Sequence, residues 1–130
     1  VEMFQCGDEI LINEVAPRPH NSGHLTIEAC KTSQFQQHIR SIFDLKLGNT
    51  VHDGHAIMLN LVGHNNYSGK VLYENLDAVF EIKNANLHIY GKQETRPNRK
   101  MGHITIICDN FEEGYNNAKL LKSKIKVKST

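Results

Sequence analysis

The sequence lacks the features that mark several classes of protein. Its 130 residues include 15 basic and 14 acidic side chains, and a net charge of +1 gives no reason to expect a nucleic-acid or anionic-membrane partner. No window approaches the roughly 20 apolar residues that a membrane span requires, and no charged-then-apolar signal pattern opens the chain. We therefore expect a cytoplasmic protein that binds neither nucleic acid nor membrane.

Cysteine is also scarce. Cys6, Cys30 and Cys108 are three in number and widely spaced, so they neither pair off fully nor form a metal-binding CxxC motif, and reduced thiols in a cytosol fit best. With 39% hydrophobic and 22% charged residues, the chain has the composition of an ordinary globular protein, and its length suffices for one domain or for parts of two. Val1 falls inside an expected strand, so we expect the native chain to begin upstream.

The first fifty residues predict a hairpin followed by a loop and a helix. Residues 1–6 and 10–15 are β-prone runs separated by turn residues 7–9. Ser33 and Gln36 form a capping box that opens a helix ending near residues 44–48. The helix has an apolar stripe that predicts packing against a sheet. The stripe comprises Phe35, Ile39, Ile42 and Phe43.

The remaining residues predict a second set of elements beyond a polar connector at 49–54. The pattern indicates strands at 56–62, 86–90 and 103–108 and a weak helix at 71–82. A charged loop is expected at 91–101. The last expected element is an amphipathic helix at 111–124, whose apolar side comprises Tyr115, Ala118, Leu121 and Ile125. The basic tail (Lys119, Lys122, Lys124, Lys126, Lys128) is interpreted as the solvated, fraying end of that helix. These elements predict an α+β fold with domains at 1–50 and 51–130.

Two glutamates on the expected hairpin are candidate metal ligands. If the turn has three residues, Glu2 faces Glu14; if it has two, Glu2 faces Asn13 and Glu14 turns to the other side. In the first register the like charges destabilise the hairpin unless a cation lies between them. Carboxylate oxygens beside an asparagine suit Mg²⁺ held against nucleotide phosphates. A solvated outer face is the alternative.

The loop at residues 16–24 combines a guanidinium with short hydrogen-bonding side chains. Arg18 has the forked donors that match carboxylate, phosphate or bicarbonate, and His20, Asn21 and Ser22 follow it closely. Prolines on both sides of Arg18 are expected to stiffen this loop, as a preorganised anion site requires. An ordinary surface turn is the alternative. A zinc pair of His20 and His24 is disfavoured, since further ligands are lacking.

A second basic cluster lies in the loop at 91–103. Four cations occur within nine residues, and such a cluster can bind a phosphate monoester through charge-assisted hydrogen bonds. A solvated run of charge is the alternative. The cations are Lys92, Arg96, Arg99 and Lys100.

Several strings in this sequence resemble one family of enzymes. The strings are INEVAPRPHNSGH at 12–24, TIEAC at 26–30, SQF at 33–35, MLNLVG at 58–63, YGK at 90–92 and RPNRKMGH at 96–103. In order and spacing they resemble the C-terminal third of 5-(carboxyamino)imidazole ribonucleotide synthetases, the ATP-grasp ligases of purine biosynthesis. The resemblance covers nearly the whole chain, and its first string is highly specific.

This resemblance implies an activity and a role for each candidate. The family couples ATP cleavage to carboxylation of aminoimidazole ribonucleotide by bicarbonate, with carboxyphosphate as the expected intermediate, and its members are usually homodimers. By resemblance, Glu2 and Glu14 hold Mg²⁺ and Asn13 and Glu14 lie against ATP. The same comparison assigns bicarbonate and carboxyphosphate to Arg18, His20, Asn21 and Ser22, and the ribonucleotide to Lys92 and Arg99, with Arg96 and Lys100 less certain.

Two other interpretations remain open. Another purine-pathway ATP-grasp enzyme, such as the formate-dependent transformylase, shares metal glutamates and an Asn-Glu strand, although the string at 20–24 argues against it. A non-catalytic interaction domain that kept the fold is the second. Because the ATP-clamping lysines and adenine pocket of the family have no match in these residues, we expect half an active site and no turnover from this chain alone.

Overall fold

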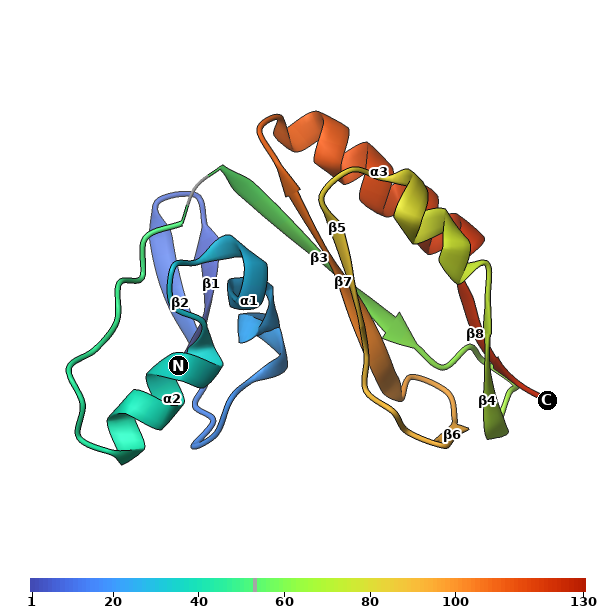
Figure 1. Cartoon of the computed structure of the whole chain (residues 1–130), viewed down its shortest axis with the longest axis horizontal. Helices are drawn as coiled ribbons and strands as arrows, with labels where there is room; N and C mark the ends of the chain where they lie inside the picture. The colour runs from blue at the N-terminus through green and yellow to red at the C-terminus, as the bar shows by residue number, and fades with distance from the viewer. Residues whose placement is uncertain (53) are drawn as a thin grey trace. The chain divides into compact units, whose positions relative to one another are not determined.

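Residues 1–52 and 54–130 are described by a computed structural model, in which the chain divides into two units (Figure 1). The first unit comprises Val1–His52 and the second Asp53–Thr130. Helices and strands occur in both, which confirms the expected α+β class. The assignment of separate functions to 1–50 and 51–130 stays a prediction. Among the described residues, no helix combines the length and apolar character needed to traverse a lipid bilayer.

An antiparallel hairpin begins the first unit. Strands β1 (Glu2–Cys6) and β2 (Glu9–Glu14) are joined by a turn of two residues, Gly7 and Asp8. Gly7 has a φ of 63°, a left-handed conformation that glycine adopts without steric cost. Glu9 was expected in the turn, but it pairs with Cys6 at the first position of β2. The shorter of the two expected turns is therefore the one that forms.

Three short helices follow the hairpin: η1 (Asn21–Leu25), α1 (Thr26–Ala29) and α2 (Gln34–Ile42). The predicted capping box is confirmed, since the Ser33 side chain accepts from the Gln36 amide while Gln36 Oε1 accepts from the Ser33 amide. The predicted packing of the α2 stripe against a sheet is wrong for the described chain. Its apolar side chains are exposed, by 62% at Ile42 and 69% at Phe43.

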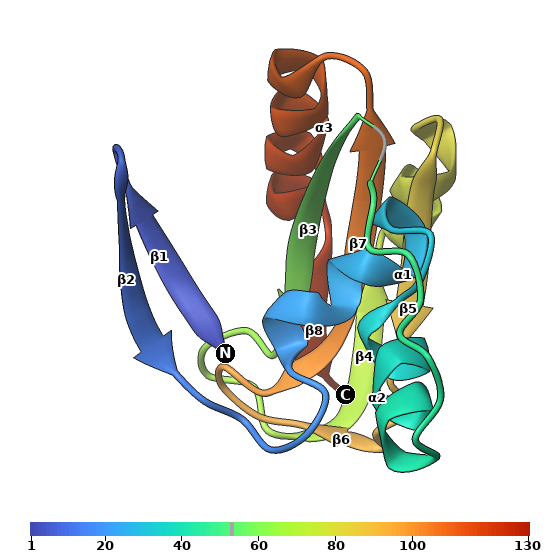
Figure 2. The same cartoon turned by 90° about the vertical axis from the view of Figure 1, so that its left-hand side faces the viewer.

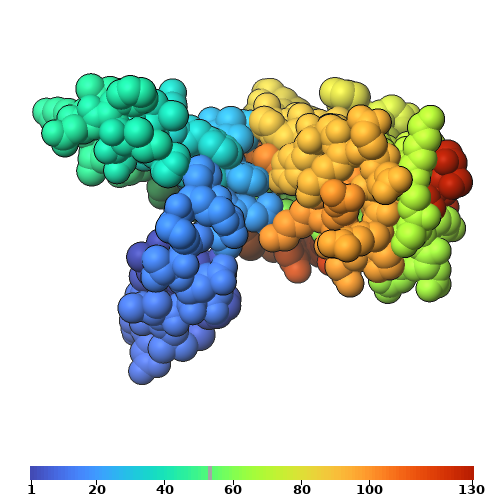
Figure 3. Space-filling view, turned by 90° about the horizontal axis from the view of Figure 1, so that it is seen from below, coloured from blue at the N-terminus to red at the C-terminus, as the bar shows by residue number. Residues whose placement is uncertain are grey.

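The first unit buries little of its apolar surface. The hairpin exposes large apolar side chains as well (Met3, Phe4, Ile10, Leu11, Ile12). In Figures 2 and 3 the hairpin and the α2 segment project as separate parts of this unit. Among its described residues, Ala29 and Thr32 are the two that are buried. Local hydrogen bonds and caps, rather than a hydrophobic core, therefore define the conformation of this unit.

A three-stranded antiparallel sheet forms the centre of the second unit. Its order is β3–β7–β5, with β3 at His55–Val62, β7 at Lys100–Cys108 and β5 at Ala85–Ile89. Helix α3 (Phe111–Lys124) packs against β3 and β7. The predicted strands and the predicted helix are confirmed, although Tyr115 on the expected buried side of α3 is 46% exposed. The core includes Leu61, Val79, Met101, Ile104, Ile106 and Leu121.

A second antiparallel sheet differs from the sequence prediction. Its order is β6–β4–β8, with β4 at Gly69–Glu74, β6 at Glu94–Thr95 and β8 at Lys126–Ser129. The predicted helix at 71–82 is wrong: it is strand β4 followed by the 3-10 helix η2 (Leu76–Glu81), with Asn75 in the left-handed conformation between them. The interpretation of the tail as fraying helix is also wrong beyond Ile125, because β8 pairs with β4 and buries Val127.

Two side chains of β4 and β8 have shifted ionisation. Burial raises the pKa of Tyr73, whose hydroxyl donates to the Met101 carbonyl at 3.2 Å. The hydrogen bond from Lys128 Nζ to the Glu74 carboxylate, 2.9 Å long, raises the pKa of that lysine. Both groups therefore stay protonated throughout the neutral pH range, and their contribution to stability is present there and is lost as pH rises through the raised pKa values.

Candidate active site

A bulge at the open end of the hairpin brings the two candidate metal ligands opposite each other. From the turn, the pairs run in regular order to Met3 and Ile12, and continuation would place Asn13 opposite Glu2. The register instead shifts between Glu2 and Met3, and Glu14 becomes the partner of Glu2. The Asn13 amide then donates to Glu2 Oε1 at 2.7 Å. A two-residue turn with one bulge thus gives the acidic pair that was expected from a three-residue turn.

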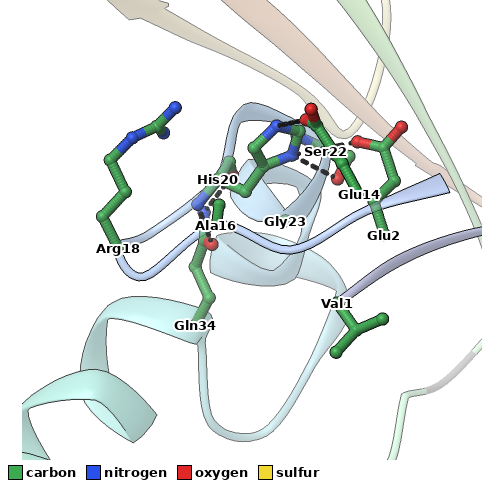
Figure 4. Close-up of a pocket in the computed structure, with 9 residues that line it drawn as sticks. All are labelled: Val1, Glu2, Glu14, Ala16, Arg18, His20, Ser22, Gly23 and Gln34. Carbon is green, nitrogen blue, oxygen red and sulfur yellow. Dashed lines mark hydrogen bonds and ion pairs between the residues drawn. The ribbon is translucent and has the colours of Figure 1, made fainter.

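The imidazole of His20 lies between these carboxylates (Figure 4). His20 Nδ1 is 3.1 Å from Glu2 Oε2, and His20 Nε2 is 2.7 Å from Glu14 Oε1. A protonated ring donates to both glutamates and offsets the repulsion between their charges. The His20 ring thus draws one candidate from the loop and two from the hairpin into a single cluster.

Ser22 sets the orientation of the His20 ring. His20 is the N-cap of η1; its Nδ1 lies 2.9 Å from Ser22 Oγ and 3.3 Å from the Ser22 amide nitrogen. The Ser22 amide donates to Nδ1 when the ring is neutral, and this leaves the proton on Nε2. In either protonation state, Nε2–H therefore points at Glu14. The short spacing of His20 and Ser22 is what allows this contact.

Gln34, which the sequence analysis did not assign to the site, holds the loop that carries His20. Its Oε1 accepts from the His20 amide at 2.8 Å, and its Nε2 donates to the His20 carbonyl at 2.7 Å. The same Nε2 lies 2.8 Å from His24 Nδ1. Gln34 was interpreted as the start of a helix, and nothing in the local sequence indicates that its side chain reaches a residue fourteen positions earlier.

Thr26 ties the same loop to the start of α2. Its hydroxyl donates to the Gly23 carbonyl at 2.5 Å and accepts from the Gln34 amide at 2.9 Å. The His24 ring also stacks on Phe35, with ring centroids 5.4 Å apart. These contacts fasten the loop to the first turn of α2. The loop is therefore held by Thr26, Gln34 and Phe35, whereas the sequence suggested that the prolines beside Arg18 would stiffen it.

A pocket of about 170 Å³ joins the cluster to the rest of the loop. Its lining is shown in Figure 4 and comprises Val1, Glu2, Glu14, Ala16, Arg18, His20, Ser22, Gly23 and Gln34. Arg18 extends from the rim away from the carboxylates, and its Nη1 donates to the Pro19 carbonyl at 3.1 Å. Asn21 lies in η1 and is not among the lining residues. The structure thus brings Glu2, Glu14, His20 and Ser22 into contact, with Arg18 at the rim of the same pocket.

The carboxylates of this cluster fit a hard divalent cation. Ligand atoms of Glu2, Glu14 and His20 lie within 4.8 Å of one another. Oxygen donors are the ligands that Mg²⁺ prefers, whereas imidazole suits softer metals. The donor set is therefore that of two glutamates able to hold Mg²⁺, with His20 Nε2 as a hydrogen-bond donor to Glu14.

The four basic side chains of the loop in the second unit fall into two groups. Lys92 Nζ donates to the Lys100 carbonyl at 2.6 Å, and Arg99 Nη1 donates to the Glu94 carbonyl at 2.8 Å, so both are held within the loop and are partly buried. Arg96 and Lys100 are exposed. The loop therefore presents two cations held by hydrogen bonds and two exposed ones.

Two family models match separate parts of the chain. The model described as the phosphoribosylaminoimidazole carboxylase C-terminal domain matches residues 56–116. The model described as the ATP-grasp domain matches residues 1–35. The first match lies within the second unit and the second within the first unit.

Named relatives agree with these matches. The chain is 48% identical over 122 residues to the phosphoribosylaminoimidazole carboxylase of Schizosaccharomyces pombe, a match to 87% of this chain and 21% of the relative. It therefore spans about a fifth of that curated relative.

Solved structures give the same result. N5-carboxyaminoimidazole ribonucleotide synthetase from Thermotoga maritima is 50% identical, with a TM-score of 0.91 over 98% of this chain and 36% of that one. The N5-carboxyaminoimidazole synthase of Aspergillus clavatus, in complex with ADP and 5-aminoimidazole ribonucleotide, is 36% identical with a TM-score of 0.76, over 93% of this chain and 33% of that one.

Proposed function

Because this chain belongs to the N5-carboxyaminoimidazole ribonucleotide synthase family, we propose that it supplies the bicarbonate-handling and ribonucleotide-binding part of an ATP-dependent carboxylase. The observation that carries the proposal is the cluster of Glu2, His20 and Glu14 in one pocket with Arg18 and Ser22. Such a cluster combines oxygen ligands for a cation with donors for an anion. The homodimer expected from the resemblance and the cytoplasmic location expected from the sequence stay predictions.

The proposed reaction joins a carboxyl group to an amine nitrogen. The terminal phosphoryl group of ATP passes to an oxygen of bicarbonate, giving ADP and carboxyphosphate. The exocyclic amine of aminoimidazole ribonucleotide then forms a bond to the carboxyl carbon, inorganic phosphate leaves, and one amine proton is lost. Mg²⁺, when bound by Glu2 and Glu14, neutralises charge on the phosphates during this transfer.

The chain's own residues have separate proposed tasks. Asn13 donates to Glu2 and so fixes the orientation of that carboxylate. His20 directs Nε2–H toward Glu14, while Arg18, Asn21 and Ser22 supply donors for bicarbonate and carboxyphosphate. Lys92 and Arg99, both tied to loop carbonyls, hold the phosphate of the ribonucleotide, with Arg96 and Lys100 at its margin. This division follows the family resemblance and the held or exposed state of each side chain.

The proposal predicts that turnover requires more than this chain. The full-length protein is expected to form ADP at a rate that depends on both bicarbonate and aminoimidazole ribonucleotide, and the 130-residue chain alone is expected to form none. A coupled assay of ADP release measures both. Formate in place of bicarbonate is the control. ADP formation stimulated by formate would favour the transformylase, and stimulation of the isolated chain by the ribonucleotide would contradict the division of the active site.

Removing one charge of the basic loop distinguishes an enzyme from a non-catalytic interaction domain with the same fold. Lys92→Ala in the full-length protein is expected to cost about 2 to 4 kcal/mol of transition-state stabilisation, measured from kcat/KM for the ribonucleotide. Lys83→Ala is the control, because Lys83 is an exposed cation of the same unit outside the basic loop, and it is expected to change the rate by about twofold or less. Equal rates for the wild type and Lys92→Ala would favour an interaction domain.

A further inference from the structure

The side chain of Gln34 makes a closed pair of hydrogen bonds with one residue of the candidate site. Its carboxamide both accepts from the amide and donates to the carbonyl of His20, with distances of 2.8 and 2.7 Å. These bonds fix the backbone of the residue whose ring contacts Glu2 and Glu14 at 3.1 and 2.7 Å. A displacement of the Gln34 side chain would therefore move the His20 backbone and, with it, the His20 imidazole.

The space around the carboxamide of Gln34 is shaped to fit it. A Cβ added at Gly23 would lie 2.5 Å from Gln34 Oε1 and 2.7 Å from its Cδ, so the absence of a side chain at Gly23 makes the room that Gln34 occupies. Gln34 is partly buried, and its backbone amide donates a hydrogen bond to Thr26 Oγ1 at 2.9 Å. Both ends of the residue are thus held.

We propose that Gln34 is a positioning residue that sets the place of the His20 imidazole between Glu2 and Glu14, and that this placement is needed for turnover. The inference rests on the proposed function, since His20 there orients Glu14, one of the two carboxylates proposed to hold Mg²⁺. Hydrogen bonds to the backbone fix the origin of the side chain, while Ser22 fixes its rotation. A shift of about 1 Å in such a group is sufficient to cost about a hundredfold in rate.

The chain offers a matched control for this role. Gln37, one turn further along α2, makes the same pair of bonds with Gly48: its Nε2 donates to the Gly48 carbonyl and its Oε1 accepts from the Gly48 amide, both at 2.9 Å. Gly48 lies outside the pocket that contains His20. Loss of Gln37 therefore removes an equivalent pair of hydrogen bonds and leaves those between Gln34 and His20 in place.

Three variants of the full-length protein test the proposal: Gln34→Met, Gln34→Glu and Gln37→Met. Methionine keeps the length of glutamine and removes both hydrogen bonds. Glutamate keeps the acceptor for the His20 amide, but it places a second oxygen against the His20 carbonyl. The measurements are kcat and the KM for ATP from bicarbonate-dependent ADP formation, and the midpoint of thermal unfolding.

Both Gln34 variants are expected to lower kcat by about 10- to 100-fold, as loss of a residue that orients a catalytic group does, with the KM for ATP changed by less than about threefold. Gln37→Met is expected to match Gln34→Met in unfolding midpoint and to keep the wild-type kcat. The proposal is overturned if Gln34→Met keeps the wild-type kcat, if Gln34→Glu restores it, or if Gln37→Met loses as much. A wild-type protein without bicarbonate-dependent ADP formation would instead overturn the proposed function.

Discussion

A glutamine in place of Glu14 is expected to lower kcat by about 10²- to 10³-fold in the full-length protein. Glutamine has the same size, so the substitution removes the charge that faces His20 Nε2 at 2.7 Å and one of the two carboxylates proposed to hold Mg²⁺. The hairpin itself is expected to keep its stability, because the change also removes the repulsion between Glu14 and Glu2. Initial rates of ADP formation over a range of Mg²⁺ concentrations measure the effect.

Glu9→Gln is the control for this substitution. Glu9 is an exposed carboxylate in the same strand, paired with Cys6 beside the turn and not among the residues that line the pocket. Its loss is expected to leave the rate within about twofold of the wild type. If Glu14→Gln and Glu9→Gln had the same rate, the acidic pair would have no part in the reaction. Thermal unfolding of both variants separates a loss of activity from a loss of structure.

Alanine at Gly63 is expected to destabilise the second unit by about 3 kcal/mol or more. A Cβ at this position would lie against the Arg96 carbonyl and Thr95 Oγ1 at distances that real atoms do not adopt. The backbone cannot move aside, because the Gly63 amide donates to the Arg99 carbonyl and its carbonyl accepts from the Asn98 amide, both at 2.9 Å. Urea unfolding of the 130-residue chain, followed by circular dichroism, measures the change in free energy.

Gly91→Ala gives the comparison that isolates steric overlap. Gly91 has a φ of +72°, but nothing lies within 4 Å of the position that its Cβ would occupy. Its substitution is therefore expected to cost about 1 to 2 kcal/mol from backbone strain alone. A smaller loss at Gly63 than at Gly91 would mean that the loop at 91–99 yields easily, and it would remove the rigid support proposed for Lys92 and Arg99.

The parts of the fold that the sequence predicted are those with strong local signals. Ser33 and Gln36 satisfy two amides at the start of α2 without help from distant residues. Helix α3 runs over Phe111–Lys124 as predicted, because its periodic apolar residues meet the β3–β7 face. Strand β7 has a β-branched run that does not suit a helix.

The errors lie where a distant partner decides the local structure. Residues 71–82 have apolar spacing compatible with a strand or a helix, and pairing of β4 with β8 selects the strand. The tail at 124–128 alternates lysine with Ile125 and Val127, a period-two pattern typical of a strand that was interpreted instead as the end of a helix. The strand forms because Val127 fits the core while Lys128 reaches Glu74. The stripe of α2 was identified correctly as apolar, but it packs on no sheet among the described residues of its own unit: His24 stacks on Phe35, and Ile39, Ile42 and Phe43 are exposed.

Several members of the candidate site could be selected from the sequence, but Gln34 and the arrangement of the site could not. Glu2, Glu14, His20 and Arg18 were selected from their residue types and from the family resemblance. The contact of His20 with both glutamates depends on a bulge and on Gln34, and neither is visible from spacing along the chain. The roles of the individual residues remain predictions that the substitutions above test.

The bulge has a consequence for how the hairpin tolerates change. The extra residue of β2 sits at the open end, opposite Glu2, whereas a three-residue turn would place it beside Gly7 and restore regular pairing as far as Glu14. In both arrangements Glu2 lies opposite Glu14, because the one extra residue of β2 only moves from the open end of the hairpin to its turn. Turn substitutions can therefore exchange the faces of Ile10, Leu11 and Ile12 while leaving the acidic pair in place.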